Sequence, residues 1–87
     1  MELYGILEKA KGELAAVTGL KPGSVVQAFR DGQGWHVQVE MLEMSRIPPA
    51  TDVLGNYEAV LSEDGAMLRF RRERTRLRGE PMEEERV

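Results

Sequence analysis

The stretch that decides the fold is WHVQVEML, residues 35–42, in which apolar and polar side chains alternate. Because successive side chains of a β-strand point to opposite faces, this alternation predicts a strand with one buried face. The preceding four residues, DGQG at 31–34, have the composition of a turn. Before them, Ser24 to Arg30 forms another apolar-rich stretch. Together these segments predict a β-hairpin with a Gly-containing loop.

Two more strands are expected downstream. The segment RIPPAT, residues 46–51, interrupts the pattern because paired prolines cannot donate to a strand ladder. A third strand then runs from Val53 to about Leu61. It carries Tyr57, Ala59 and Leu61 on one face, and Glu58 and Val60 on the other. After a turn at 62–65, a fourth strand starts near Ala66 and continues into a run of arginines.

The first 18 residues predict a helix. Apolar residues recur at three- and four-residue spacing, which gathers them on one face: Leu3, Ile6, Leu7, Ala10, Leu14 and Val17. Gly19 supplies a C-cap and Pro22 prevents continuation. The predicted fold class is therefore α+β, with one N-terminal helix packed on an antiparallel β-meander of three to four strands. We expect a single domain over residues 1–79 and a disordered acidic tail over 80–87.

Composition narrows the function classes. The 87 residues contain no Cys and a single His, His36, so neither a disulfide nor a thiolate metal site is expected. Chains this small usually need stabilisation beyond their core, from disulfides, a metal or association with another chain. Association is the remaining possibility here, so a homodimer is expected. No apolar run reaches the roughly 20 residues that span a bilayer. The first 17 residues lack the pattern of a signal peptide, which favours a cytoplasmic protein without membrane contact.

A charge asymmetry is hidden in the net charge of −3. Residues 69–78 contain six Arg and one Glu, whereas the segments before and after them are acidic. Three interpretations remain open for this Arg-rich strand: binding of nucleic-acid phosphates, a charged edge strand that resists edge-to-edge pairing, and docking to an acidic protein. The first is the least favoured, because Phe70 is the only stacking aromatic there and the rest of the chain would repel a polyanion.

No constellation of catalytic residues emerges from the sequence. The serines lack a nucleophile-elbow pattern, and His36 lies on the polar side of its strand. The glycines fall in turns and at helix ends rather than in a strand–loop–helix order that binds phosphate. We therefore expect no enzymatic activity, no cofactor and no metal.

An ordered series of short motifs resembles the gas vesicle protein O family. The series begins with WHVQVE at 35–40, continues through Glu43 and RIP at 46–48 to DVL at 52–54, and then reaches Tyr57-Glu58, Asp64-Gly65 and the Arg-rich ending. The resemblance extends from the first helix to Arg78. One departure is that family members often place an aromatic residue among these arginines, where this chain has Thr75 and Leu77.

The resemblance implies an accessory protein of gas vesicle assembly, associated with gas vesicles and binding other accessory proteins and the shell protein. The shell protein itself is very hydrophobic, whereas this chain is 31% charged. The hypothetical partner-binding residues are the following: Arg46, Ile47, Pro48, Tyr57, Glu58, Arg72, Arg74 and Arg76. A purely structural alternative is that Arg46 fastens its loop to Asp52 or Glu58. The alternative function is a nucleic-acid-binding or regulatory module that uses residues 69–78.

Overall fold

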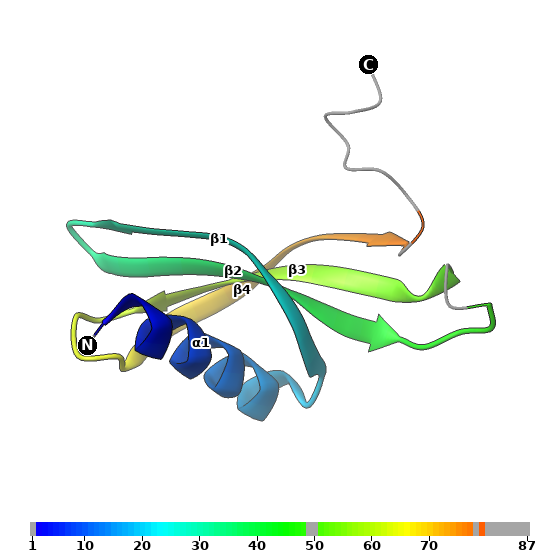
Figure 1. The fold of residues 1–87 in the computed structure, drawn as a ribbon, viewed down its shortest axis with the longest axis horizontal. Helices are drawn as coiled ribbons and strands as arrows, with labels where there is room; N and C mark the ends of the chain where they lie inside the picture. Colours follow the sequence, from blue (N-terminus) through cyan, green and yellow to red (C-terminus); the bar gives the residue numbers. More distant parts are fainter. Residues whose placement is uncertain (1, 49–50, 78, 80–87) are drawn as a thin grey trace, which may run out of the picture.

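One helix and one four-stranded antiparallel sheet make up the computed structural model, which describes residues 2–48, 51–77 and 79. The elements follow in the order α1 (Leu3–Thr18), β1 (Lys21–Asp31), β2 (Gly34–Met44), β3 (Val53–Leu61) and β4 (Met67–Leu77). Each strand pairs with the next, which gives the sheet order β1-β2-β3-β4 (Figure 1). The predicted α+β class and meander are confirmed. The predicted acidic tail at 80–87 lies outside the described residues.

Helix α1 ends where the sequence predicts. Gly19 adopts a left-handed conformation with φ of 73°, and its N–H donates to the carbonyl of Ala15 at 2.9 Å. Such a C-cap satisfies a carbonyl of the last turn that no helical N–H can reach. The Thr18 hydroxyl also donates to the Leu14 carbonyl at 2.6 Å. The chain therefore leaves the helix in a fixed direction and enters β1 two residues later.

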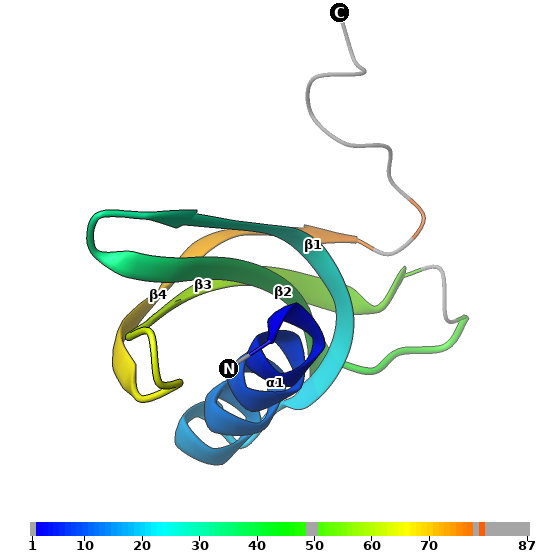
Figure 2. The same cartoon turned by 60° about the vertical axis from the view of Figure 1, so that its left-hand side comes forward.

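The core lies between α1 and one face of the sheet. Figure 2 shows the strongly twisted sheet bending around the helix. The core residues come from α1, β2 and β3, and at most 9% of each is exposed: Ile6, Ala10, Leu14, Val37, Val39, Met41, Tyr57, Ala59 and Leu61. The apolar side chains that alternate in β2 thus pack against those on one face of α1. Burial of this apolar area is the main source of stability.

The strands are longer than the sequence pattern predicts. β1 begins at Lys21 rather than Ser24, and β2 continues to Met44. Pro22 is tolerated in β1 because this is an edge strand, and register shifts flank Val25 on both sides. At the β1–β2 turn, Gly34 has φ of 132°, and a Cβ there would collide with the carbonyl of Leu61 on β3. Glycine is therefore required where the turn crosses the neighbouring strand.

The β2–β3 hairpin extends past the helix, so its far end is not covered by α1 (Figure 1). We call the sheet surface that packs on α1 the covered face and the opposite surface the open face. Among the residues that the structure describes, no helix is long and apolar enough to cross a membrane.

Candidate functional site

The tip of the β2–β3 hairpin, defined here by Arg46, Ile47 and Pro48, is the most exposed apolar feature of the described chain. The Ile47 side chain is 99% exposed, and Met44 beside it is 51% exposed. The peptide bond between Ile47 and Pro48 is cis. A fully exposed β-branched residue at a loop tip contributes nothing to the core, which makes it a candidate contact for another molecule.

This tip is held in place by its own backbone and by one buried carboxylate. Asp52 is 5% exposed, and its Oδ1 accepts the backbone N–H of Arg46 at 2.7 Å. On the other side of the loop, the N–H and the hydroxyl of Thr51 donate to the Pro48 carbonyl at 3.0 and 2.8 Å. The contact that the sequence predicted between Arg46 and Asp52 therefore forms through the backbone of Arg46.

The Arg46 side chain remains available for a partner. Its Nε donates to the sulfur of Met44 at 3.2 Å, a weak acceptor. No carboxylate of the described residues forms an ion pair with this guanidinium. Arg46 thus presents unused donors next to the exposed Ile47.

A second cluster lies on the covered face, where the hairpin leaves the helix. Glu43 accepts the Tyr57 hydroxyl at 2.7 Å and is held by Arg72 through two contacts, from Nε at 3.0 Å and from an Nη at 2.9 Å. The Glu43 side chain is 16% exposed. Partial burial together with the hydrogen bond to Glu43 raises the pKa of Tyr57 above its ordinary value of 10.0. Tyr57 therefore acts as a donor, and the bidentate Arg72 neutralises the carboxylate.

Gly55 makes this cluster possible. A Cβ on Gly55 would collide with the Glu43 carboxylate and would lie 2.8 Å from Cε1 of Tyr57. The carboxylate therefore occupies the space that a side chain on β3 would otherwise fill. Neither Glu43 nor Gly55 was predicted as a site residue, although the Glu43 position belongs to the motif series noted in the sequence.

On the open face, His36 lies between two carboxylates. Its Nε2 is 2.9 Å from Oδ2 of Asp31, and its Nδ1 is 3.4 Å from Oε2 of Glu58. The ring of Phe29 stacks on the imidazole with the centroids 4.7 Å apart and an interplanar angle of 2°. Both ring nitrogens thus lie beside carboxylates, although Nε2 is buried and makes no well-aligned hydrogen bond among the described residues. The hydrogen bond from the Gln33 backbone, followed by the contact with His36, lowers the pKa of Asp31.

Strict alternation along a strand predicts that Arg72, Arg74 and Arg76 share one face of the sheet, opposite to Arg69 and Arg71. The arginines of β4 are arranged differently. Arg72 is opposite Tyr57, whereas Arg74 is opposite Asn56, so Glu73 is an extra residue in the strand. This β-bulge moves Arg74 and Arg76 to the open face and leaves Arg72 on the covered face. The predicted grouping is therefore wrong.

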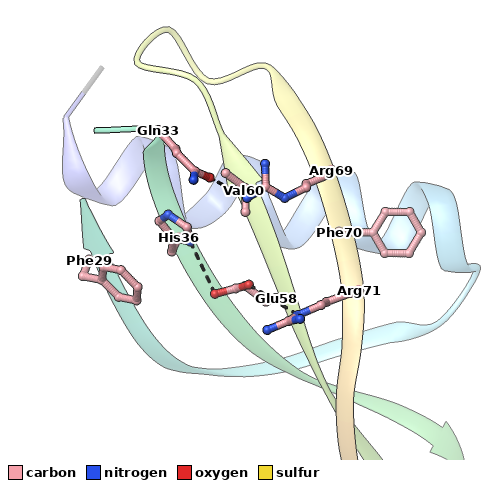
Figure 3. Close-up of a pocket in the computed structure, with 8 residues that line it drawn as sticks. All are labelled: Phe29, Gln33, His36, Glu58, Val60, Arg69, Phe70 and Arg71. Carbon is pink, nitrogen blue, oxygen red and sulfur yellow. Dashed lines mark hydrogen bonds and ion pairs between the residues drawn. The ribbon is translucent and has the colours of Figure 1, made fainter. Parts of the chain in front are cut away.

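On the open face, Arg71 and Arg76 have acidic neighbours. Arg76 contacts Glu40 at 2.7 Å, with both side chains about three-quarters buried or more. Arg71 lies 2.9 Å from Glu73 and 3.8 Å from Glu58. The ring of Phe70 points away from Arg69 and Arg71 (Figure 3). Surfaces that bind nucleic acids combine several exposed cations with stacking rings, and Phe70 supplies no such ring between these two arginines.

A hollow of about 340 Å³ opens on this face between β1 and β4. Val60 and His36 are 2% and 8% exposed and form its floor. The other lining residues stand around them: Phe29, Gln33, Glu58, Arg69, Phe70 and Arg71 (Figure 3). No group of three or more His, Cys, Asp or Glu side chains in the described ranges is arranged to hold a metal ion.

The predicted partner-binding residues therefore divide among three places. Arg46, Ile47 and Pro48 form the hairpin tip. Tyr57 and Arg72 meet at Glu43 on the covered face. The open face carries the remaining three residues: Glu58, Arg74 and Arg76. Because Tyr57 and Glu58 are adjacent in one strand, they point to opposite faces and cannot form one surface with the tip.

Comparisons with known proteins point to one family. The chain matches the family described as gas vesicle synthesis protein GvpO over residues 1–82. It is also similar to a curated protein named gas vesicle protein O, from Streptomyces sp. (strain CB03234). The two are 36% identical over 74 residues, which cover 85% of this chain and 58% of that protein. The chain thus spans less than two thirds of the length of this relative. No solved structure matches the chain.

Proposed function

Because this chain belongs to the GvpO family of gas vesicle synthesis proteins, we propose that it is a non-enzymatic accessory factor that binds other gas vesicle proteins during assembly. The family is the one that the sequence motifs predicted. The mode of action, the partners and a cytoplasmic location are part of the proposal. The partners we propose are the shell protein and other accessory proteins.

One observation supports this proposal most directly: Ile47 is 99% exposed on a loop that is held on both sides by hydrogen bonds. Binding that orders a loose loop loses conformational entropy, whereas a loop already held in place loses less. The tip is therefore suited to insert one apolar side chain into a pocket of a partner. Met44, which is half exposed and flexible, widens this apolar contact.

The charged surroundings of the tip support the same interpretation. Arg46 has no carboxylate partner among the described residues, so it can pair with an acidic group at the rim of a partner's pocket. An apolar anchor inside a polar rim is the usual arrangement of protein-binding surfaces. Such a surface can bind an apolar shell subunit without being an extended apolar patch that would aggregate.

The test is co-expression of the tagged chain with the gas vesicle proteins of its host, followed by affinity capture with and without nuclease. We expect capture of gas vesicle proteins in both conditions. The Ile47→Ser variant should reduce capture at least about tenfold, because exposed apolar anchors dominate such contacts. Its free energy of unfolding should change by less than about 0.5 kcal/mol, since Ile47 is 99% exposed.

The matched control is Val17→Ser, which removes a half-exposed apolar side chain from α1. Capture by this variant should equal that of the unchanged chain. Equal capture by the Ile47→Ser variant would contradict the role of the tip. Loss of all capture after nuclease treatment would contradict protein binding and favour the nucleic-acid alternative.

A homodimer remains part of the proposal. Both β1 and β4 are edge strands, and edge strands offer unpaired backbone groups to a second copy. We expect light scattering at high concentration to give twice the mass of one chain. A single-chain mass at all concentrations would contradict self-association and leave binding through the hairpin tip unaffected.

A further inference from the structure

The hollow on the open face contains a guanidinium that has no acidic partner among the described residues. Arg69 donates to the neutral side-chain oxygen of Gln33, and no carboxylate of the described residues forms an ion pair with it. The next arginine on this face differs, because Arg71 lies within ion-pair distance of both Glu58 and Glu73. A guanidinium has five N–H donors in a fork that fits a carboxylate, and a single amide oxygen uses little of this capacity.

The acidic group that lines the hollow already has partners. The carboxylate of Glu58 is engaged by His36 and Arg71, so it does not compete for Arg69. Val60 is buried beneath the hollow, and the half-exposed ring of Phe29 stands at its edge (Figure 3). With a volume of about 340 Å³, the hollow has room for one or two side chains rather than a large ligand.

We propose that this hollow receives one acidic side chain of a partner protein, with Arg69 as the group that binds the carboxylate and Phe29 and Val60 contacting an apolar neighbour. The charge on the open face favours this occupant. One uncommitted guanidinium matches one negative charge, whereas a nucleic acid or another polyanion requires several available cations. This contact is separate from the hairpin tip, so either one can fail while the other stands.

The experiment titrates the isotope-labelled chain with a blocked pentapeptide that has one glutamate between two phenylalanines, monitored by amide chemical shifts. We expect saturable shifts centred on Gln33, Val60 and Arg69. A matched peptide with glutamine in place of the glutamate should bind about five- to tenfold more weakly. The Arg69→Gln variant should show the same loss toward the glutamate peptide, because an exposed charge-assisted pair is worth roughly that factor.

Two control variants sharpen the result. Arg69→Lys keeps the charge and loses the planar fork, so its affinity should fall between the others. Lys9→Gln removes one positive charge from the outer side of α1 and should bind like the unchanged chain. The proposal is overturned if Arg69→Gln binds the glutamate peptide normally, or if the shifts centre on the hairpin tip.

Two further probes separate the sources of negative charge. Inorganic phosphate should bind no more tightly than the glutamine peptide, and tighter binding would replace the proposal with a phosphate site. A synthetic peptide of residues 79–87, which contains four Glu, should bind more weakly than the glutamate peptide because it lacks an aromatic neighbour. Tighter binding of that peptide would overturn the partner assignment and point to this chain's own acidic segment.

Discussion

The two faces of the sheet are built from alternate residues of the same strands, yet they are held in different ways. On the covered face, Val37, Val39 and Met41 are fully buried against α1. On the open face, Glu40 of β2 and Glu58 of β3 contact arginines of β4. Apolar burial is non-directional and strong, whereas a partly exposed ion pair adds little free energy but fixes where a side chain lies.

The covered face therefore provides stability, and the open face is available for binding, in a chain whose core is small. A domain of this size buries only about 60% of its unfolded surface, so nearly all of the covered face is needed to keep it folded. The open face and the hairpin tip are therefore where contacts with other molecules can form at little cost in stability. The following variants test this separation, from the largest expected effect to the smallest.

The largest effect is expected on the covered face, from Leu14→Ala. Leu14 is fully buried between α1 and the sheet, and its truncation leaves a cavity. The expected loss is about 3 kcal/mol in the free energy of unfolding, measured by urea denaturation followed by circular dichroism. Val17→Ala, at a half-exposed position next to the end of the same helix, should change it by less than about 0.5 kcal/mol. Similar losses for both variants would contradict the assignment of the core.

A glycine-to-alanine pair tests the Glu43 cluster. Gly55→Ala should cost about 2 kcal/mol, because the new methyl group displaces the Glu43 carboxylate and presses on the Tyr57 ring. In α1, Gly12 has no atom near its would-be Cβ, so Gly12→Ala should stabilise the chain by about 1 kcal/mol. Thermal unfolding should show a lower melting temperature for Gly55→Ala and a higher one for Gly12→Ala than for the unchanged chain. A stabilising Gly55→Ala would show that the carboxylate does not occupy this space.

The hydroxyl of Tyr57 makes stability depend on alkaline pH. The pKa of Tyr57 is raised in the folded chain above its ordinary value of 10.0, so the folded state holds this proton more tightly than the unfolded state. This contribution is fully present below about pH 10 and is lost as the pH rises through the raised pKa. Urea denaturation at pH values from about 8 to about 11, a range that brackets the ordinary tyrosine pKa of about 10, should show this decline.

Tyr57→Phe is the matched variant for that measurement. It should lose about 1 kcal/mol near neutral pH, because Glu43 loses one of its donors, and its stability should fall less above pH 10. An alkaline decline of the same size in both proteins would assign the effect to another group.

The smallest effect is expected on the open face, from Arg76→Gln. Arg76 and Glu40 are 25% and 18% exposed at their side chains, so breaking the pair should cost about 1 kcal/mol. Lys9→Gln, which breaks the more exposed pair with Glu13, should cost about 0.3 kcal/mol. Chemical denaturation at low and high salt measures both costs. A loss near 3 kcal/mol for Arg76→Gln would mean that the open face contributes to stability as the core does.

The fold could be predicted because its signals are local. Leu3 to Thr18 has helical spacing followed by Gly19, and β2 alternates from Trp35 to Met41. The helix, the covered face and the antiparallel order therefore followed from the sequence. The extension of β1 back to Lys21 was missed because Pro22 reads as a strand breaker, and only its place at a sheet edge removes that penalty.

The site was less predictable because it depends on register between strands. Arg72, Arg74 and Arg76 look equivalent in the sequence, and only the extra residue at Glu73 separates them. Glu43 accepts a hydrogen bond from Arg72, which is 29 positions away in the sequence. The Glu43 carboxylate fits there only because Gly55 has no side chain. No pattern within a single strand contains such information. Ile47, by contrast, was named from the sequence as one of the hypothetical partner-binding residues.

The bulge at Glu73 also has a consequence for how this strand can change through evolution. Each arginine can be replaced singly, and the effect stays with that side chain. Deletion of Glu73 would instead restore strict alternation and exchange the faces of every residue after it, Arg74 and Arg76 included. We therefore expect point substitutions to accumulate in β4 more readily than single-residue insertions or deletions.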